Sequence, residues 1–241
     1  MVKKNKYDSD SNEYYNSISC KYDDILNSNP LNIKIRNEVK QYFLKNVSGK
    51  YILDFGGGTG KDLEWLTDAG YNVFFCEPSD GMRNIAVQNN KDLESSGRIT
   101  FLDSETANYV NWSNDEPPFN KKVDAILSNF AVLNSINELA ILSEKLALVT
   151  QTGSHFIFTV LNLNLKKFSY RNILGMIQSV LKDNCPSINI KNEGKSLKTY
   201  LHTKRKLISS MKKHFSYVNN FPLSGRIFNI YHFVRNEQAV E

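Results

Sequence analysis

Acidic residues and glycines stand in the chain at a spacing that suits a ribose-bearing ligand. Asp54 ends an apolar run and is followed by Gly56, Gly58 and Gly60, which stand two apart. Glycine has no Cβ, so the backbone there can turn sharply and approach a ligand closely. Glu77 follows where a carboxylate in an open α/β sheet accepts hydrogen bonds from two ribose hydroxyls. Because a carboxylate beside the glycines would repel a phosphate, the predicted ligand carries positive charge there instead.

Two strands and a helix must position these residues. The apolar residues 51–53 predict a buried strand that leads into the glycine turn, and a helix is predicted to follow over Lys61–Ala69. A second apolar strand, Tyr71–Cys76, ends directly before Glu77. Open α/β sheets bind nucleotide-like ligands at the carboxyl ends of their strands, so we expect the glycines and Glu77 to meet at that edge.

The rest of the chain continues the alternation of strands and helices. The further predicted elements are strands over Arg98–Leu102, Val123–Leu127 and Ser154–Val160, a helix over Glu138–Val149, a last helix over Lys204–Phe215, and a closing antiparallel pair over Tyr217–Phe221 and Arg226–Val234. Five alternating β and α units in a row predict a parallel sheet, and the closing pair predicts a reversed last strand.

The glycine spacing, D-x-G-x-G-x-G, differs from the G-x-G-x-x-G of dinucleotide sites. It resembles the first motif of the class I S-adenosylmethionine-dependent methyltransferases, of the type acting on small molecules. The resemblance implies S-adenosylmethionine as the cofactor and a Rossmann-like, mostly parallel seven-stranded sheet with helices on both faces. It also implies that Asp54 takes up the charged amino end of the cofactor, while the glycine backbone passes under the ribose and the methionine part.

Near the start of the chain, Ser19-Cys20-Lys21-Tyr22-Asp23 resembles an A-x-x-Y-D segment of this family, with serine in place of alanine. The resemblance implies that Tyr22 and the later Arg36 cover the methionine end of the cofactor. For Arg36 taken alone, a surface position on a packing helix is an equally good interpretation. Met82, one turn after Glu77, would contact the adenine.

Two segments after later strands complete the cofactor site that the resemblance implies. An acid after the third strand would accept a hydrogen bond from the adenine amine, and Asp103 and Glu105 stay open as alternatives. The run from Ser128 to Asn134 resembles the family's S-N-F-x-x-L-N segment. It implies that Ser128, Asn129 and Phe130 meet the cofactor, while Asn134 lines the acceptor pocket.

The division of the chain follows from its composition and from the resemblance. Residues 1–12 are polar and predict a flexible tail, and residues 13–241 predict a single methyltransferase domain. Within it, 13–47 would form a helical cap and 163–195 a lid inserted after the fifth strand. The helix-like part of that lid is Leu165–Leu181, and Leu197–His202 would return as an extended piece.

The acceptor is expected beneath the cap and the lid, with Tyr22, Asn134 and Tyr200 around it. His202, beside the lid, is the candidate general base, although a packing role is the commoner one for such a histidine. His155 and His232 lie inside predicted strands, and we expect them to be structural.

Composition bounds the remaining hypotheses. The three cysteines are widely separated, so we expect free thiols and no metal. The 241 residues contain no apolar run long enough for a membrane span and no apolar leader, so we expect a cytoplasmic protein without membrane contact. The net charge of +5 owes much to Lys191–Lys213, which is either a solvated face or a collar for an anionic or carrier-bound acceptor.

The leading hypothesis is a methyltransferase that acts on a hydroxyl or amine of a small organic acceptor. The alternatives are a methyltransferase acting on RNA or protein and a non-catalytic subunit that binds S-adenosylmethionine. We do not expect a nucleic-acid partner, because no module of basic residues interleaved with aromatic ones is visible in the sequence. The oligomeric state is left open.

Overall fold

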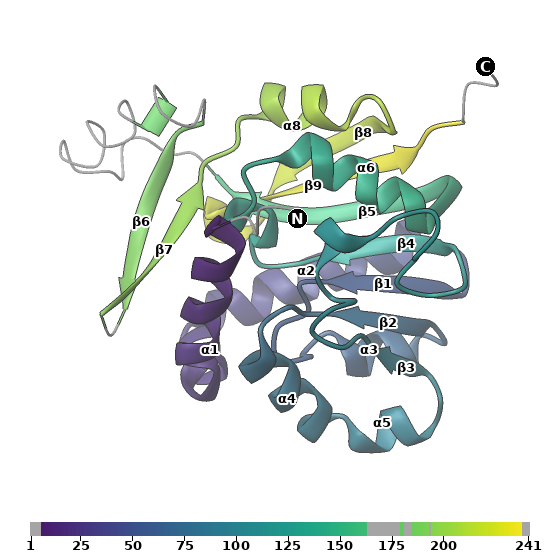
Figure 1. Cartoon of the computed structure of the whole chain (residues 1–241), viewed down its shortest axis with the longest axis horizontal. Helices are drawn as coiled ribbons and strands as arrows, with labels where there is room; N and C mark the ends of the chain where they lie inside the picture. The colour runs from purple at the N-terminus through teal and green to yellow at the C-terminus, as the bar shows by residue number, and fades with distance from the viewer. Residues whose placement is uncertain (1–5, 163–178, 181–184, 193, 238–241) are drawn as a thin grey trace.

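The computed structural model describes residues 6–162, 179–180, 185–192 and 194–237 (Figure 1). Its elements, in chain order, are α1 (Lys6–Asn27), α2 (Pro30–Asn46), β1 (Tyr51–Phe55), α3 (Leu63–Asp68), β2 (Asn72–Cys76), α4 (Asp80–Asn89), α5 (Lys91–Ser95), β3 (Ile99–Phe101), η1 (Tyr109–Asn111), β4 (Val123–Ser128), η2 (Val132–Ser135), α6 (Leu139–Val149), β5 (Thr150–Leu161), β6 (Ser187–Asn192), β7 (Lys195–Tyr200), α8 (Lys204–Met211), β8 (Phe215–Pro222), η4 (Ser224–Arg226) and β9 (Phe228–Arg235).

A seven-stranded sheet runs through the centre of the molecule in the order β3-β2-β1-β4-β5-β9-β8 (Figure 1). Strands β3, β2, β1, β4 and β5 run parallel to one another, whereas β9 is antiparallel to both β5 and β8. This topology confirms the predicted Rossmann-like sheet with a reversed last strand. The chain changes direction across the sheet between β1 and β4, and ligands bind where the strand order reverses in this way.

Helices cover both faces of the sheet. Side chains alternate along β1, so Leu53 packs into a cluster with Leu142 of α6 and Leu207 of α8, while Ile52 packs into a second cluster with Phe43 of α2. All five side chains are fully buried. Burying one such side chain contributes about 1.5–3 kcal/mol, so the two clusters hold the edge of the sheet in place.

The amino-terminal helices meet at the break that the sequence predicts. Asn29 caps α2 by accepting a hydrogen bond from the Leu31 N–H, and Pro30 stands at the first helical position, where no N–H is needed. Helix α1 begins at Lys6, inside the segment 1–12 for which the sequence predicts a flexible tail, and residues 1–5 lie outside the described residues. Apolar periodicity could not show this start, because a polar segment can extend a helix whose backbone bonds are already formed.

The second, smaller sheet is the antiparallel hairpin β6–β7, which stands at the same end of the main sheet as α1 (Figure 1). Strand β7 overlaps the predicted extended piece Leu197–His202. Most of the predicted lid helix Leu165–Leu181 lies outside the described residues, and the lid over 163–195 therefore stays a prediction. The last helix is shorter than predicted, since α8 ends at Met211 and Phe215 already begins β8.

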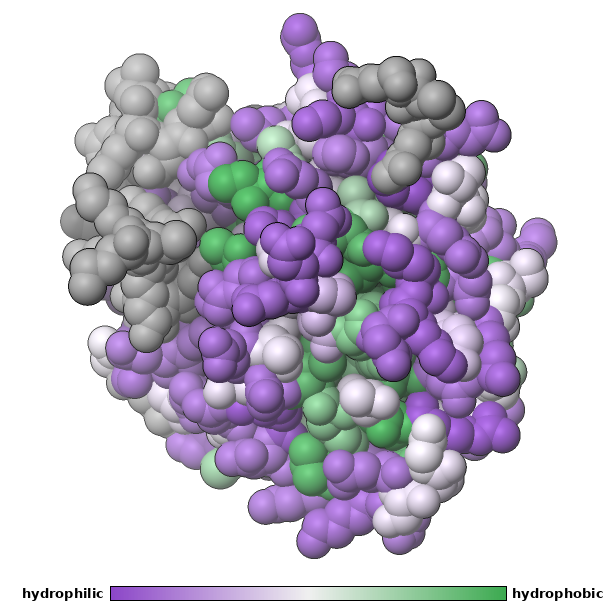
Figure 2. Space-filling model, turned by 45° about the vertical axis from the view of Figure 1, so that its right-hand side comes forward, coloured by the Kyte–Doolittle hydropathy of each residue, from purple (hydrophilic) through white to green (hydrophobic). Residues whose placement is uncertain are grey.

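The described part of the chain contains no helix that is long and apolar enough to cross a membrane. Figure 2 shows one face of the molecule, which is mostly hydrophilic with hydrophobic side chains gathered in a central band. Cys20, Cys76 and Cys185 form no disulfide among the described residues. Within the same described residues, no group of three His, Cys, Asp or Glu side chains is placed to hold a metal ion.

Candidate functional site

The turn after β1 presents backbone to its surroundings. Gly56 and Gly58 have φ angles of +72° and +59°, which residues with a Cβ rarely adopt. A Cβ at Gly56 would lie 2.5 Å from Val132, and one at Gly58 would stand 3.7 Å from the ring of Tyr22. The Gly56 N–H donates to the Cys76 carbonyl oxygen at 2.7 Å, which fixes the turn against β2. The turn therefore places bare backbone beneath a tyrosine ring.

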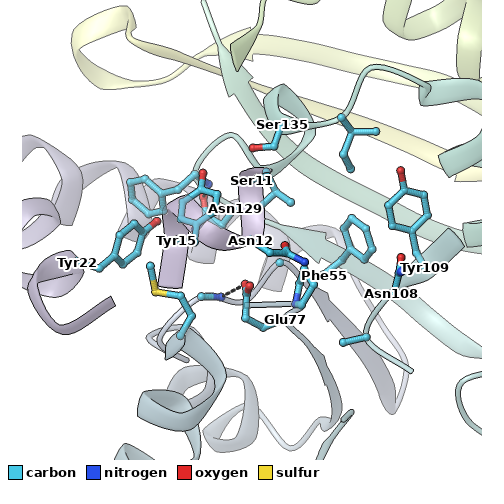
Figure 3. A pocket seen from close by; sticks show the side chains of 18 residues that line it. Ser11, Asn12, Tyr15, Tyr22, Phe55, Glu77, Asn108, Tyr109, Asn129 and Ser135 are labelled. Carbon is cyan, nitrogen blue, oxygen red and sulfur yellow. Dashed lines mark hydrogen bonds between the residues drawn. The ribbon is translucent and has the colours of Figure 1, made fainter. Parts of the chain in front are cut away.

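Glu77 follows the end of β2, and its carboxylate points into the pocket (Figure 3). One oxygen accepts a hydrogen bond from the Gly58 N–H at 2.9 Å, and the other accepts from the Ser79 N–H at 2.9 Å. Burial raises the pKa of Glu77 to about 6, and the hydrogen bonds from Ser79 and Gly58 oppose that rise. Each carboxylate oxygen has a second lone pair, so Glu77 can accept two further hydrogen bonds from neighbouring hydroxyls.

Three charged residues lie behind the turn. Asp54 is 1% exposed, its carboxylate lies against Gly57, and its Oδ2 has no hydrogen-bond partner among the described residues. Burial, and then the nearby Asp62, raise the pKa of Asp54 well above its usual range, while Arg36 opposes the rise. Arg36 pairs with Asp62 at 2.6 Å. A buried carboxylate oxygen without a partner is costly, and a cationic ligand group nearby would reduce that cost.

Helix α1 is fastened over the turn at two points. Near its middle, the Asn16 side-chain oxygen accepts from the Gly81 N–H at 2.8 Å, at the start of α4. Two turns later, Asp23 accepts from the Thr59 hydroxyl at 2.5 Å and pairs with Lys61 at 3.0 Å. These contacts position α1 as one wall of the site.

Two tyrosines of α1 face the glycine turn and Glu77. Tyr15 and Tyr22 lie two helical turns apart on the same helix face, with ring centroids 6.3 Å apart in an edge-to-face arrangement. Burial raises the pKa of Tyr15 to about 12, with a hydrogen bond to Ser135 opposing the rise. Burial likewise raises the pKa of Tyr22. Both hydroxyls therefore stay protonated at neutral pH and act as hydrogen-bonding groups.

Together these elements enclose a pocket of about 850 Å³, counting its solvent-facing part. Seven of the predicted site residues line it, namely Tyr22, Gly56, Gly58, Glu77, Met82, Asn129 and Phe130. The other lining residues are Ser11, Asn12, Tyr15, Phe55, Pro78, Ala107, Asn108, Tyr109, Val132, Ser135 and Ile136. Figure 3 shows Tyr15 and Tyr22 on one side of Glu77, with Asn108 and Tyr109 on the other.

Gly60 and Ser128, which were predicted to contact the cofactor, lie behind the pocket. A Cβ at Gly60 would stand 2.9 Å from side-chain atoms of Asn90 and Leu63, so glycine here allows close packing beneath the turn. The buried Ser128 hydroxyl donates to the Phe55 carbonyl oxygen at 2.9 Å. Both residues shape the walls from behind without facing the pocket.

The acids predicted to bind the adenine amine do not line the pocket. Asp103 accepts hydrogen bonds from the Thr106 N–H at 2.8 Å and the Glu105 N–H at 3.1 Å, and these hold the pKa of Asp103 below its usual range. Asp103 thus caps the turn after β3, and both acids are exposed. The turn brings Asn108 and Tyr109 to the pocket instead. Counting from the strand end could not find this, because the turn is held by side-chain hydrogen bonds.

His202, the predicted general base, occupies a packing position in the structure, and its catalytic role stays a prediction. It is 3% exposed, and its Nε2 lies 2.9 Å from the Ile136 carbonyl oxygen and 3.0 Å from that of Leu133. Its Nδ1 lies 3.6 Å from the Cys185 sulfur. Burial lowers the pKa of His202, and the residue does not line the pocket.

Asn134 joins three elements and does not face the pocket. Its side-chain nitrogen donates to the Tyr200 carbonyl oxygen at 2.5 Å, and its oxygen accepts from the Leu161 N–H at 3.0 Å. Because it is 1% exposed, these contacts make it a link between η2, β5 and β7. Tyr200 lines a second pocket, which lies between α1, η2 and the β6–β7 hairpin.

Several residues that line the pocket were not predicted from the sequence. Ser11 and Asn12 fell in the expected tail. Tyr15 carried a usable signal, since it stands seven residues before Tyr22 and must share its helix face. Ser135 directly follows the segment that was singled out, whereas Asn108 lies in an irregular stretch with no motif to mark it.

The described residues fit S-adenosylmethionine. The turn offers backbone that a Cβ would obstruct, Glu77 offers acceptors for a ribose, and Asp54 offers an unpaired carboxylate oxygen. Arg36, whose guanidinium carbon lies 4.6 Å from the Phe130 ring centre, supplies positive charge near the place expected for the methionine carboxylate. Residues that together accept a ribose, an ammonium and a carboxylate are what this cofactor requires.

Comparison with known proteins agrees with this site. A family model described as "Methyltransferase domain" matches residues 32–215. An uncharacterized methyltransferase, YrrT, from Bacillus subtilis is 35% identical over 108 residues, which cover 45% of this chain and 43% of that protein. The chain thus matches less than half the length of this curated relative.

Two solved structures share the fold. An S-adenosylmethionine-dependent methyltransferase from Clostridium acetobutylicum superposes with a TM-score of 0.64 at 14% identity, covering 92% of this chain and 99% of that one. The N-methyltransferase NodS from Bradyrhizobium japonicum, in complex with S-adenosyl-L-homocysteine, gives a TM-score of 0.60 at 12% identity, covering 88% and 91%. With the family match over most of its length, the chain belongs to the class I S-adenosylmethionine-dependent methyltransferases.

Proposed function

We propose that the protein is an enzyme that transfers a methyl group from S-adenosylmethionine to a hydroxyl or amine of a small organic acceptor. The observation that carries the proposal is the presence of the Glu77 carboxylate and the glycine turn in one pocket. Family membership supports the cofactor. The small size of the acceptor is supported by a lining of aromatic and neutral polar side chains beneath α1.

Each part of the cofactor has residues of this chain to bind it. Glu77 would accept hydrogen bonds from the ribose hydroxyls, and Met82 offers apolar surface to the adenine. Asn108 would accept from the adenine amine, in the role first predicted for Asp103 or Glu105. Asp54 and Arg36 would face the ammonium and carboxylate of the methionine part.

When bound, S-adenosylmethionine would supply its methyl group to a lone pair of the acceptor. The electron pair of the carbon–sulfur bond would stay on sulfur, and the acceptor proton would leave to water. The chain contributes chiefly by alignment, which can account for much of the rate of a two-reactant step. Tyr15 and Ser135 would orient the acceptor through their hydroxyls. Among the described residues that line this pocket, Glu77 is the one carboxylate, and we propose that it binds the ribose.

Calorimetry tests the proposal directly. S-adenosylhomocysteine and S-adenosylmethionine should bind and raise the Tm of the protein, because a ligand that binds the native state alone stabilises it. NAD should do neither. Release of S-adenosylhomocysteine in the presence of small amines and phenols then tests transfer. Binding of NAD without binding of either sulfur compound would overturn the assignment of the site, whereas binding without release would favour a non-catalytic subunit.

The RNA alternative rests on the basic segment Lys191–Lys213 and has its own test. A basic segment that binds RNA by neutralising its phosphates loses affinity steeply as the salt concentration rises. RNA binding that does not weaken with salt would therefore count against the RNA alternative. A cytoplasmic location and a single domain over residues 13–241 stay predictions.

A further inference from the structure

A third pocket, of about 830 Å³ counting its solvent-facing part, lies at the edge of the main sheet where β4 and β5 begin. We call it the amino-edge pocket. It is lined by the first residues of β5, 150–152, and by four side chains that can carry charge, namely Lys122, Glu144, His214 and Arg235. The arrangement of these four groups decides which ligand the pocket suits.

The amino-edge pocket is separate from the cofactor pocket. Lys122 stands directly before β4, whereas Asn129, which lines the cofactor pocket, stands directly after it. Strand β4 has 6 residues, and a strand rises about 3.3 Å per residue, so about 20 Å of sheet lies between the two. A small molecule bound at the amino edge therefore lies out of reach of a methyl group in the cofactor pocket.

Arg235 brings a buried positive charge to the amino-edge pocket. It is the last residue of β9 and is 7% exposed. Its Nη1 donates to the carbonyl oxygens of His214 at 3.0 Å and of Asn236 at 3.3 Å, but its buried Nε has no hydrogen-bond partner among the described residues. The ion pairs within that part of the chain do not include Arg235. Because a buried charge without a counter-charge is costly, an anion beside Arg235 would stabilise the native state.

His214 adds a second group that lacks a partner. Its Nε2 is buried and forms no hydrogen bond with the described residues. Burial, and then the charges of Arg235 and Lys213, lower the pKa of His214, while Glu144 opposes that change. The imidazole is therefore neutral at pH 7, and a neutral imidazole can donate from one nitrogen. Since an arginine nitrogen can only donate, a hydrogen-bond acceptor is the group that suits both side chains.

Lys122 places another positive charge on the opposite side of β5. In the sheet order, β5 stands between β4, which Lys122 precedes, and β9, which Arg235 ends. The Lys122 ammonium donates to the Leu148 carbonyl oxygen at the end of α6, which uses one of its three protons. Lys122 also forms no ion pair with a described carboxylate. Two cationic groups thus line one pocket from both sides of β5.

Glu144 is the one carboxylate among the described lining residues, and it is exposed. Solvent and salt screen an exposed charge more than a buried one, so Glu144 offsets the Arg235 charge incompletely. The balance of the pocket favours an anion. Glu144 would repel that anion, and removing its charge gives a variant whose effect should have the opposite sign to the loss of a lysine.

We infer that the amino-edge pocket binds a small anionic molecule through a phosphate or carboxylate group held by Arg235 and Lys122. A guanidinium and an ammonium both form charge-assisted hydrogen bonds with the oxygens of such groups. This binding site is distinct from the site of methyl transfer, and the inference does not depend on the proposed function.

The test titrates the full-length protein with pyrophosphate and with citrate at constant ionic strength and follows the carbon-bound imidazole protons by NMR. At least one anion should bind and shift the His214 signal, which His214→Gln identifies. Binding of pyrophosphate alone would assign a phosphate ligand, and binding of citrate alone a carboxylate ligand. Saturation with S-adenosylhomocysteine should leave the shift of His214 in place, because the two pockets lie at opposite edges of the sheet.

Matched variants then assign the binding to named charges. Lys122→Gln should weaken it about fivefold or more, since the amide can still donate to Leu148 but carries no charge. The control is Lys121→Gln, which removes the charge of an exposed neighbour that contacts the Tyr51 hydroxyl outside the pocket lining, and it should change the affinity by less than about twofold. Glu144→Gln should tighten binding. Arg235→Gln should abolish it, and if this buried variant does not fold, Lys122→Gln and Glu144→Gln carry the test.

Three results would overturn the inference. The first is a His214 signal that neither anion moves, and the second is an affinity that Glu144→Gln weakens. The third is an equal effect of Lys122→Gln and Lys121→Gln, because the binding would then belong to the general charge of the surface. Displacement of the anion by S-adenosylhomocysteine would also contradict the inference, since it would place the anion in the cofactor pocket.

Discussion

The walls of the two pockets beside α1 in this protein are formed by different parts of the chain. The first is bounded by a turn of backbone between two adjacent strands, with Glu77 held by backbone N–H groups of Gly58 and Ser79. The second is bounded by side chains of a separate two-stranded hairpin and by single residues of α1 and η2. A turn of backbone can bind the parts of a cofactor that all members of a family share. Exposed side chains, by contrast, can be substituted without disturbing the sheet. We therefore expect cofactor recognition to depend on the fold itself.

The largest effect is expected from Glu77→Gln. The amide keeps the shape of the side chain but loses the charge and directs N–H groups where the ribose hydroxyls need acceptors. Losing hydrogen bonds to a charged group costs about 1.5–3 kcal/mol, so the affinity for S-adenosylhomocysteine should fall roughly 10- to 150-fold in calorimetry. Unchanged cofactor affinity in a folded variant would return Glu77 to a purely structural role.

The glycine turn gives the next largest effect, with Gly58→Ala compared against Gly70→Ala. Both glycines have positive φ, +59° and +91°, so each substitution should cost about 1–2 kcal/mol of unfolding free energy in urea denaturation. Gly70 has no atom within 4 Å of its built Cβ, whereas a Cβ at Gly58 projects toward Tyr22 and fills the space above the turn. Only Gly58→Ala should weaken S-adenosylhomocysteine binding.

An equal loss of cofactor affinity in both glycine variants would mean that backbone strain, and not the bare surface of the turn, is responsible. Equal affinity in both, with the expected loss of stability, would show that the ligand does not approach Gly58. Either result would remove the contrast between a pocket made of backbone and one made of side chains.

The pH dependence of binding offers a third measurement. Ribose hydroxyls donate to the ionised carboxylate, and in the free protein the pKa of Glu77 is about 6, compared with an ordinary value of 4.5. Affinity for S-adenosylhomocysteine should therefore rise with pH through pH 6, by about tenfold between pH 5 and 7, since one pKa unit corresponds to about 1.4 kcal/mol. Glu77→Gln should flatten this dependence, and a profile that persists in the variant would exclude Glu77 as its source.

The raised pKa of Glu77 makes folding stability depend on pH in the opposite direction to cofactor affinity. Because the pKa of Glu77 is raised, the native state binds more protons than the unfolded state between about pH 4.5 and 6. This group alone should therefore lower the free energy of unfolding as pH rises through that window, by at most about 2 kcal/mol. Comparing the unaltered protein with Glu77→Gln in urea at pH 4.5 and 7 isolates the contribution.

The contrast between the pockets also decides what the sequence could predict. The sheet, its reversed last strand and Glu77 followed from contiguous apolar runs and a short motif, because β1, its turn and β2 are neighbours in the chain. Asn108 and the hairpin lining were out of reach, since their places depend on a capped turn and on packing between distant segments. The role of His202 could not be read from the sequence, because a buried histidine that contacts two carbonyl oxygens has the same sequence signature as a catalytic one.

His202→Ala should therefore affect stability and not chemistry. It would leave the buried carbonyl oxygens of Leu133 and Ile136 without their donor, at a cost of about 1–3 kcal/mol in unfolding free energy. The affinity for S-adenosylhomocysteine and the pH profile of methyl transfer should stay as in the unaltered protein. A profile that loses its basic limb in the variant would reinstate His202 as a base.

The smallest effect on the affinity for S-adenosylhomocysteine is expected from Glu105→Gln, which should leave that affinity unchanged. Glu105 is exposed and absent from the pocket lining, and the turn that contains it is held by Asp103 through backbone N–H groups that the substitution leaves in place. If Asn108 receives the adenine amine, Asn108→Ala should weaken S-adenosylhomocysteine binding by about 1 kcal/mol, the usual contribution of one neutral hydrogen bond, while Glu105→Gln does not. The reverse pattern in calorimetry would place the adenine against the acid, and it would mean that the loop after β3 moves when the cofactor binds. The first pocket would then depend on a side chain from a mobile turn, just as the second pocket depends on its hairpin. Only the glycine turn and Glu77 would still distinguish the first pocket from the second.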